Sequence, residues 1–126
     1  VYKRQMHLTS DVQLICLPTS KAAFVRRGYD ANHILAAALA REVGLRYRPG
    51  VLRFSRALAD QRDLNLEQRA VNLSGSMTAR GASQRAILVD DVVTTGASLL
   101  EARRALELIG VRVEGFVAFA ETLRRT

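Results

Sequence analysis

The sequence is poor in the residues that cross-link chains or bind transition metals. Its 126 residues include one cysteine, Cys16, and two histidines, His7 and His33. A single cysteine excludes an internal disulfide, and the sequence shows no cluster of zinc or iron ligands. Cys16 lies inside the apolar run 12–17, so we expect a buried structural thiol rather than a nucleophile. Both histidines are expected to have surface roles.

Long apolar runs are missing too. No stretch approaches the length needed to span a membrane, and no charged-then-apolar leader of the secretory type is present. We therefore expect a cytoplasmic protein without a membrane partner. A chain of this length with 48% hydrophobic residues is expected to form a single domain over 1–126. Residues 1–5 are expected to be a non-native leader, with the natural protein extending further toward its amino terminus.

Aromatic residues are few, which bears on how the basic charge is interpreted. Nineteen Lys and Arg against twelve Asp and Glu give a formal charge of +7, and this raises nucleic acid as a partner. Aromatics make up only 6%, however, the arginines are spread along the chain, and no zinc-finger or RNA-recognition signature is present. An anionic substrate with several phosphates would equally favour basic side chains around a cleft. Candidates for that role are Lys21, Arg26, Arg27, Arg62 and Arg69.

Strand and helix patterns alternate along the chain. The apolar run 12–17 predicts a first core strand, and 51–54 predicts a short second strand. Further strands are expected over 86–90 and 111–120, separated by a helical pattern over 98–109. This alternation predicts an α/β fold with a central parallel sheet.

The first predicted helix follows the first strand. Asp30 or Asn32 is expected to cap it, and Gly44 to close it after Val43. The residues expected to face the sheet are Ala31, Leu35, Ala38 and Leu39.

A polar, charged stretch over 55–65 is too long for a minimal connection, and a lid is expected there. A short helix should follow it, because Asn65 and Gln68 resemble a capping box.

The most informative stretch is 86–100, which reads Ala-Ile-Leu-Val-Asp-Asp-Val-Val-Thr-Thr-Gly-Ala-Ser-Leu-Leu. It places two acids, Asp90 and Asp91, and a hydroxyl-rich turn between a buried strand and a helix. A helix that begins there exposes backbone N–H groups and the positive end of its dipole, which together can bind a phosphate. Gly96 is expected to let the backbone approach the ligand closely.

The two acids allow two interpretations. Successive side chains of a strand face opposite ways, so Asp90 and Asp91 reach one ligand only if the chain turns between or just after them. Paired carboxylates suit sugar hydroxyls, or a cation that bridges to the ligand. The alternative is that they only solvate or cap the end of a strand. The Thr-Thr-Gly-Ala-Ser sequence that follows favours a binding site for a phosphorylated sugar.

This stretch resembles the phosphoribosyl-diphosphate (PRPP) motif of type I phosphoribosyltransferases. The resemblance implies their fold, a Rossmann-like central parallel β-sheet flanked by helices. It also implies that Asp90 and Asp91 are the catalytic acids that hold the ribose 2′- and 3′-hydroxyls. The residues that would wrap the 5′-phosphate are Thr94, Thr95, Gly96, Ala97 and Ser98.

Other segments resemble the ComF, or competence-associated, branch of this family. The segment 27–30, Arg-Gly-Tyr-Asp, resembles the branch's Arg-Gly-Phe-Asn entry to its first helix. The branch's middle pattern is matched at Gln61, Leu64, Arg69, Asn72 and Gly75, with Gln68 in place of Glu. Ser76 and Met77 replace the Ala-Phe that follows in that pattern. The resemblance covers roughly 14–120.

The resemblance also implies the ligand sites around the motif. The segment 19–28, with Lys21, Arg26 and Arg27, would be the loop that binds pyrophosphate. The segment 55–72, with Arg62 and Arg69, would be a mobile flap.

The implied reaction is the displacement of pyrophosphate from C1′ of PRPP by a nitrogen nucleophile, with Mg²⁺ as cofactor. The Mg²⁺ would be held mainly through PRPP, with Asp90 and Asp91 as candidate ligands. The acceptor is an unidentified nucleobase-like molecule, and a homodimer is left open. The alternative function is a catalytically silent PRPP-binding accessory protein of the competence or DNA-uptake machinery.

Overall fold

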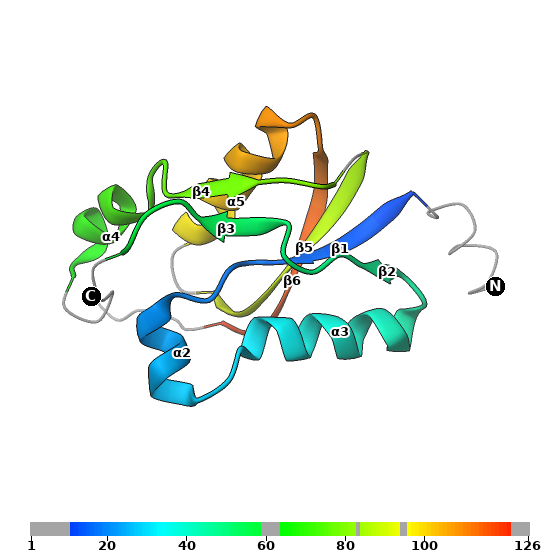
Figure 1. Ribbon diagram of the computed structural model, residues 1–126, viewed down its shortest axis with the longest axis horizontal. Coiled ribbons are helices and arrows are strands. Elements are labelled where there is room, and N and C mark those ends of the chain that lie inside the picture. Colours follow the sequence, from blue (N-terminus) through cyan, green and yellow to red (C-terminus); the bar gives the residue numbers. More distant parts are fainter. Residues whose placement is uncertain (1–10, 59–63, 83, 94–95, 122–126) are drawn as a thin grey trace.

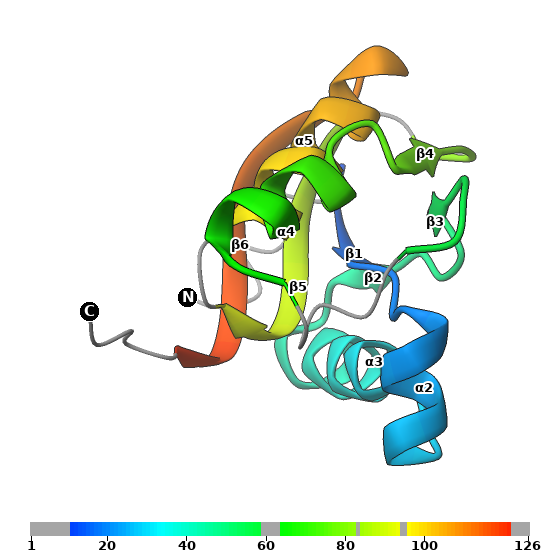
Figure 2. The same cartoon turned by 90° about the vertical axis from the view of Figure 1, so that its left-hand side faces the viewer.

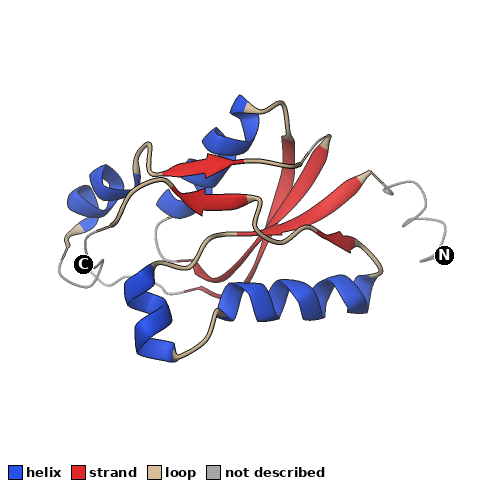
Figure 3. Cartoon of the chain, viewed as in Figure 1, coloured by secondary structure: helices blue, strands red, loops and turns tan. Residues whose placement is uncertain are grey.

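A computed structural model describes residues 11–58, 64–82, 84–93 and 96–121 (Figure 1). Within them, a four-stranded sheet has the order β2-β1-β5-β6, and each neighbouring pair is parallel. The predicted α/β fold with a central parallel sheet is confirmed (Figure 3). The elements in order are β1 (Val12–Cys16), α2 (Lys21–Arg27), α3 (Ala31–Val43), β2 (Arg46–Tyr47), β3 (Leu52–Phe54), α4 (Leu66–Leu73), β4 (Met77–Ala79), β5 (Arg85–Val93), α5 (Ala97–Leu108) and β6 (Arg112–Glu121).

Helices cover both faces of the sheet (Figure 2). On one face Leu14 and Val89 pack against alanines of α3, and on the other Ile15 and Leu88 pack in one cluster with Leu106 of α5. Neighbouring residues of β1 and of β5 therefore enter different apolar clusters. This arrangement explains why both strands read as continuous apolar runs rather than as alternating patterns.

Helix α3 begins and ends as predicted, and of the residues expected to face the sheet Ala31 is buried and Leu39 packs against the core. The Asp30 side chain accepts a hydrogen bond from the His33 backbone N–H (3.1 Å), and Gly44 closes the helix with a φ of 74°. Ala36 and Ala40 are buried together with Ala31, whereas Ala38 is exposed and Leu35 and Leu39 are half-buried. Small side chains at i and i+4 let the helix lie close to β1 and β5, so Ala36 and Ala40 are buried in the contact and Leu39 packs against it.

The predicted strand at 51–54 exists as β3 but does not belong to the parallel sheet. It pairs antiparallel with β4 in a separate two-stranded sheet, with Phe54 opposite Met77. The place beside β1 belongs to β2, the two-residue strand Arg46–Tyr47. Such a short strand has no period to detect, which is why the sequence did not reveal it.

A buried carboxylate, Glu101, attaches the small sheet to α5. Its oxygens accept hydrogen bonds from the backbone N–H groups of Gly75 (3.0 Å) and Met77 (2.9 Å), and from Nε (2.8 Å) and Nη2 (2.7 Å) of Arg104. The hydrogen bonds from Arg104 are the main cause that lowers the pKa of Glu101 to about 2. The carboxylate therefore stays ionised and fixes β4 to α5.

The segment after β3 contains the predicted short helix. The Asn65 side chain accepts from the Gln68 N–H (2.8 Å), and the Gln68 side chain accepts from the Asn65 N–H (3.0 Å). The capping box that opens α4 is thus confirmed. None of the helices in the described ranges is long and apolar enough to cross a membrane.

Candidate functional site

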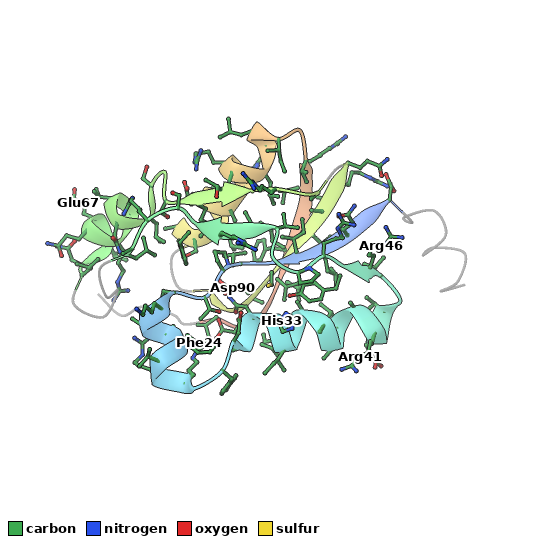
Figure 4. All side chains as sticks on the ribbon, viewed as in Figure 1. Phe24, His33, Arg41, Arg46, Glu67 and Asp90 are labelled. Carbon is green, nitrogen blue, oxygen red and sulfur yellow. The ribbon has the colours of Figure 1, made fainter. Side chains whose placement is uncertain are left out.

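The two acids lie at the carboxyl end of β5, just beyond its last pair with β1. That last pair is Val89 with Cys16, and Asp90 then pairs only with Ala118 of β6. The chain does not turn between the acids, because β5 continues to Val93. Their side chains nevertheless interact, since a hydrogen bond between them contributes to the pKa of Asp90. Figure 4 shows Asp90 at the end of the sheet near α2 and the start of α3.

Asp90 is held in a buried position, with 8% of its surface exposed. Burial is the main cause that raises its pKa to about 7, and the charge and hydrogen bond of Asp91 raise it as well. The Asp91 backbone N–H donates to Asp90 Oδ1 (3.0 Å), which opposes this shift by favouring the ionised form. At neutral pH the Asp90 carboxyl can therefore donate as well as accept a hydrogen bond. Such a group suits a ligand hydroxyl, which also does both.

Asp91 is engaged on both carboxylate oxygens. Oδ1 accepts from the Val92 backbone N–H (2.9 Å), and Oδ2 forms an ion pair with the Arg27 guanidinium. The side chains of Arg27 and Asp91 are 37% and 19% exposed. A ligand that approaches this edge of the sheet therefore meets an ion pair rather than a free carboxylate.

Asn32, which the sequence indicates only as a candidate helix cap, positions the acids. Its side chain is buried, donates to the Leu17 carbonyl (2.9 Å) and accepts from the Asp91 N–H (3.0 Å). It thereby ties the end of β1 to the end of β5, beyond the last backbone pair. The available signal was a polar residue in the first turn of a helix, on the side that faces the sheet.

The predicted phosphate-binding turn is described in part. Thr94 and Thr95 lie outside the described residues. Gly96 occupies the N-cap position of α5 with a φ of 80°, and Ala97 and Ser98 are half-buried in the first turn. A Cβ at Gly96 would meet nothing within 4 Å, so the left-handed backbone, not lack of space, requires glycine here in this structure.

The segment expected to be a pyrophosphate loop is largely helical. Ser20 caps α2 by accepting from the Ala23 N–H (3.1 Å), and Gly28 ends the helix with a φ of 78°. The adjacent arginines point to different places, since Arg27 reaches Asp91 while Arg26 lines a cavity with Lys21. The sequence contained two signals for this helix, namely a serine before its first residue and a glycine after its last.

That cavity has a volume of about 1010 Å³ and lies beside the acids rather than around them. Its wall is formed by the end of β1, by α2, by the start of α3, by β2, and by β3 together with residues 56–58 that follow β3. Asp90 and Asp91 are not among its lining residues. The side chains on its wall include Lys21, Arg26, Arg53 and Arg56, so its surroundings are cationic.

Cys16 lines this cavity and is the first residue in a chain of polar contacts. Its Sγ lies 3.3 Å from the Tyr47 hydroxyl, which lies 2.7 Å from Nδ1 of the exposed His33. Burial raises the pKa of the Cys16 thiol and the pKa of Tyr47. The thiol is therefore half-buried at a cavity wall rather than buried as expected, and its raised pKa keeps it protonated, which disfavours a nucleophilic role. His7 lies outside the described residues.

The two arginines assigned to the flap are described in part. Arg69 is half-buried in α4, and Arg62 lies outside the described residues.

The donor set at the acids suits Mg²⁺ bound together with a phosphate ligand. The described residues contain no group of three or more His, Cys, Asp or Glu that could hold a metal ion alone. Mg²⁺ prefers oxygen ligands and is commonly held by one or two carboxylates and the substrate's phosphates. Asp90 and Asp91 supply two such carboxylates, so they fit a magnesium ion that arrives with its ligand.

Comparisons with known proteins show the family to which the chain belongs. Residues 26–126 match the family model of the phosphoribosyl transferase domain. Over 114 residues the chain is 28% identical to Competence protein F of Haemophilus influenzae, which covers 86% of this chain and 50% of that protein. The chain thus spans about half the length of this curated relative.

Two solved structures are also similar to the chain. Orotate phosphoribosyltransferase from Aeropyrum pernix has a TM-score of 0.47 and 17% identity, over 93% of this chain and 62% of that one. An adenine phosphoribosyltransferase has a TM-score of 0.48 and 14% identity, over 96% of this chain and 65% of that one.

The family match includes the acids, the N-terminus of α5 and most of the parallel sheet. The sheet flanked by helices is the type I phosphoribosyltransferase fold. With four-fifths of its length inside the matched segment, the chain belongs to the phosphoribosyl transferase domain family, as a ComF-like member.

Proposed function

We propose that the chain binds PRPP at the carboxyl edge of its sheet and transfers the phosphoribosyl group to a nitrogen nucleophile. The observation that carries this proposal is the pair Asp90 and Asp91, whose side chains interact, with the basic end of α2 at Asp91 and the N-terminus of α5 following shortly after β5. Carboxyls that accept and donate hydrogen bonds fit the ribose hydroxyls, and a helix N-terminus fits the 5′-phosphate.

Each half of the donor then has its own residues. Asp90 and Asp91 hold the ribose, and the turn 94–98 holds the 5′-phosphate. Lys21, Arg26 and Arg27 bind the pyrophosphate, which their fixed positive charges stabilise as it leaves. Arg62 and Arg69 act from the flap.

The proposed step forms a C1′–N bond with the nucleophile's lone pair. It breaks the bond between C1′ and the pyrophosphate oxygen, and pyrophosphate leaves with the electron pair. The nitrogen then loses its proton to solvent. Bound Mg²⁺ supplies charge neutralisation on the pyrophosphate. The residues of the chain orient the ribose so that the nucleophile and the leaving group stand on opposite sides of C1′.

A second candidate is a PRPP-binding accessory protein that does not turn over. The name of the relative Competence protein F is a reason to consider a role in competence or DNA uptake.

Calorimetry followed by a turnover screen separates the two candidates. PRPP is titrated into the protein with Mg²⁺, and a panel of nucleobases is then tested for pyrophosphate release. Binding with release for one base supports the transferase, and binding without release for any base supports the accessory protein. If PRPP does not bind, both are refuted. The Asp90→Asn, Asp91→Asn double variant is the negative control.

A further inference from the structure

We infer that Arg27 is a shared cation that changes partner during ligand binding. In the free protein it neutralises Asp91, and in the complex it moves to the pyrophosphate half of the ligand. The two halves of the ligand therefore bind cooperatively, although they occupy different residues. This inference rests on the proposed function, since it requires that the site bind both a sugar phosphate and pyrophosphate.

The position of Arg27 allows such a change of partner. It is the last residue of α2, and Gly28 ends the helix immediately after it. Its side chain is 37% exposed, so the guanidinium has room to reach solvent and an incoming anion. Arg26 cannot replace it at Asp91, because successive helical residues project about 100° apart.

Asp91 is otherwise held in place. Its backbone N–H donates to Asn32 and to Asp90, and its Oδ1 accepts from the Val92 N–H. Oδ2, which Arg27 occupies, is therefore the oxygen that a ribose hydroxyl would take. The carboxylate does not have to move when the guanidinium leaves, and only the arginine side chain changes its position.

The coupling follows from a single broken contact. A sugar phosphate that takes Oδ2 must break the ion pair, and pyrophosphate that takes the guanidinium must break the same ion pair. When both are bound the contact is broken once rather than twice, so each ligand strengthens the other. Because the Arg27 side chain is exposed and the ion pair is screened by solvent, we expect an effect of about three- to fivefold.

The test is a set of binding measurements with the two halves of the ligand. The probes are Mg²⁺-pyrophosphate and 1-deoxyribose 5-phosphate, which lacks the 1-hydroxyl that would collide with pyrophosphate. In the unmodified protein, pyrophosphate should tighten sugar-phosphate binding by about three- to fivefold. In Arg27→Ala the coupling should fall to about one. The sugar phosphate alone should bind more tightly than before, because no ion pair remains to be broken.

Two further variants control for charge and for conservative replacement. Arg41→Ala removes one positive charge from the last turn of α3, away from Asp90 (Figure 4), and should leave the coupling unchanged. Arg27→Lys keeps a cation beside Asp91 and should keep part of the coupling.

The outcomes separate this inference from the proposed function. If the unmodified protein binds both probes independently, the shared cation is refuted while the proposed function stands. The shared cation is also refuted, and the proposed function still stands, if Arg27→Ala weakens sugar-phosphate binding more than Arg41→Ala does. If neither probe nor PRPP binds the unmodified protein, both are refuted.

Discussion

Replacing Asp90 by asparagine should stabilise the protein while it removes a residue of the proposed site. Asparagine has the shape of the protonated acid, and its Oδ1 can keep the hydrogen bond from the Asp91 N–H, which measures 3.0 Å. Its amide N–H can also donate to the Asp91 carboxylate. The substitution therefore retains the contacts of the neutral acid and eliminates the buried negative charge.

The size and the pH window of the effect follow from the raised pKa. Burial and the charge of Asp91 raise the pKa of Asp90 from 3.8 to about 7. An ionised Asp90 then destabilises the folded state by about 4 kcal/mol at most. Below pH 3.8 Asp90 is protonated in both the folded and the unfolded states, so the raised pKa does not lower the stability. Stability falls as the pH rises between the two values, because the unfolded state ionises first, and it levels off above the higher value.

Urea unfolding of both proteins at about pH 4 and about pH 8 measures this effect. We expect the unfolding free energy of the variant, relative to that of the unmodified protein, to increase by a few kcal/mol from the lower to the higher pH. Glu101 does not interfere, because both proteins contain it and its own pH dependence cancels in the difference between them. Glu42→Gln removes an exposed carboxylate from α3 and should show no such trend. A difference in unfolding free energy that is the same at both pH values would refute the reasoning.

Three other substitutions test the site and its support. Asp90→Asn combined with Asp91→Asn should weaken PRPP binding about a hundredfold or more by calorimetry, since each charge-assisted hydrogen bond contributes roughly 1.5–3 kcal/mol; an unchanged affinity would exclude the assignment. Gly96→Val should weaken ribose 5-phosphate binding far more than pyrophosphate binding, because valine resists a φ of 80°; equal losses would indicate damage to the fold. Glu101→Gln should lower the unfolding free energy by roughly 1.5–3 kcal/mol in urea, and no change would mean that Glu101 does not anchor β4.

Local signals in the sequence predicted the elements that begin or end with a side-chain contact. The cap at Asp30, the stop at Gly44 and the capping box of Asn65 with Gln68 all form as expected. These features depend on residues three or four positions apart, so the sequence contains all the information they need. The two acids were found for a similar reason, because their motif is continuous.

Contacts between distant segments could not be predicted in the same way. The Arg27–Asp91 ion pair and the bridge from Asn32 to Asp91 join residues that only the folded sheet brings together. The same is true of β2, which is a strand only because β1 lies beside it. Glu101 reads as one of several charged residues on a helix, and its burial depends on β4.

The pairing of β1 with β5 has a consequence for how the protein folds. Val12 lies opposite Arg85, so the centre of the sheet cannot form until all the chain between them has been made and its loop closed. Closing so long a loop has an entropic penalty that contacts within neighbouring segments do not have, and it slows folding. The acids follow directly on the paired part of β5, so they are assembled only once this closure is complete. A ligand that binds them therefore binds the folded chain alone, and raises its melting temperature by mass action.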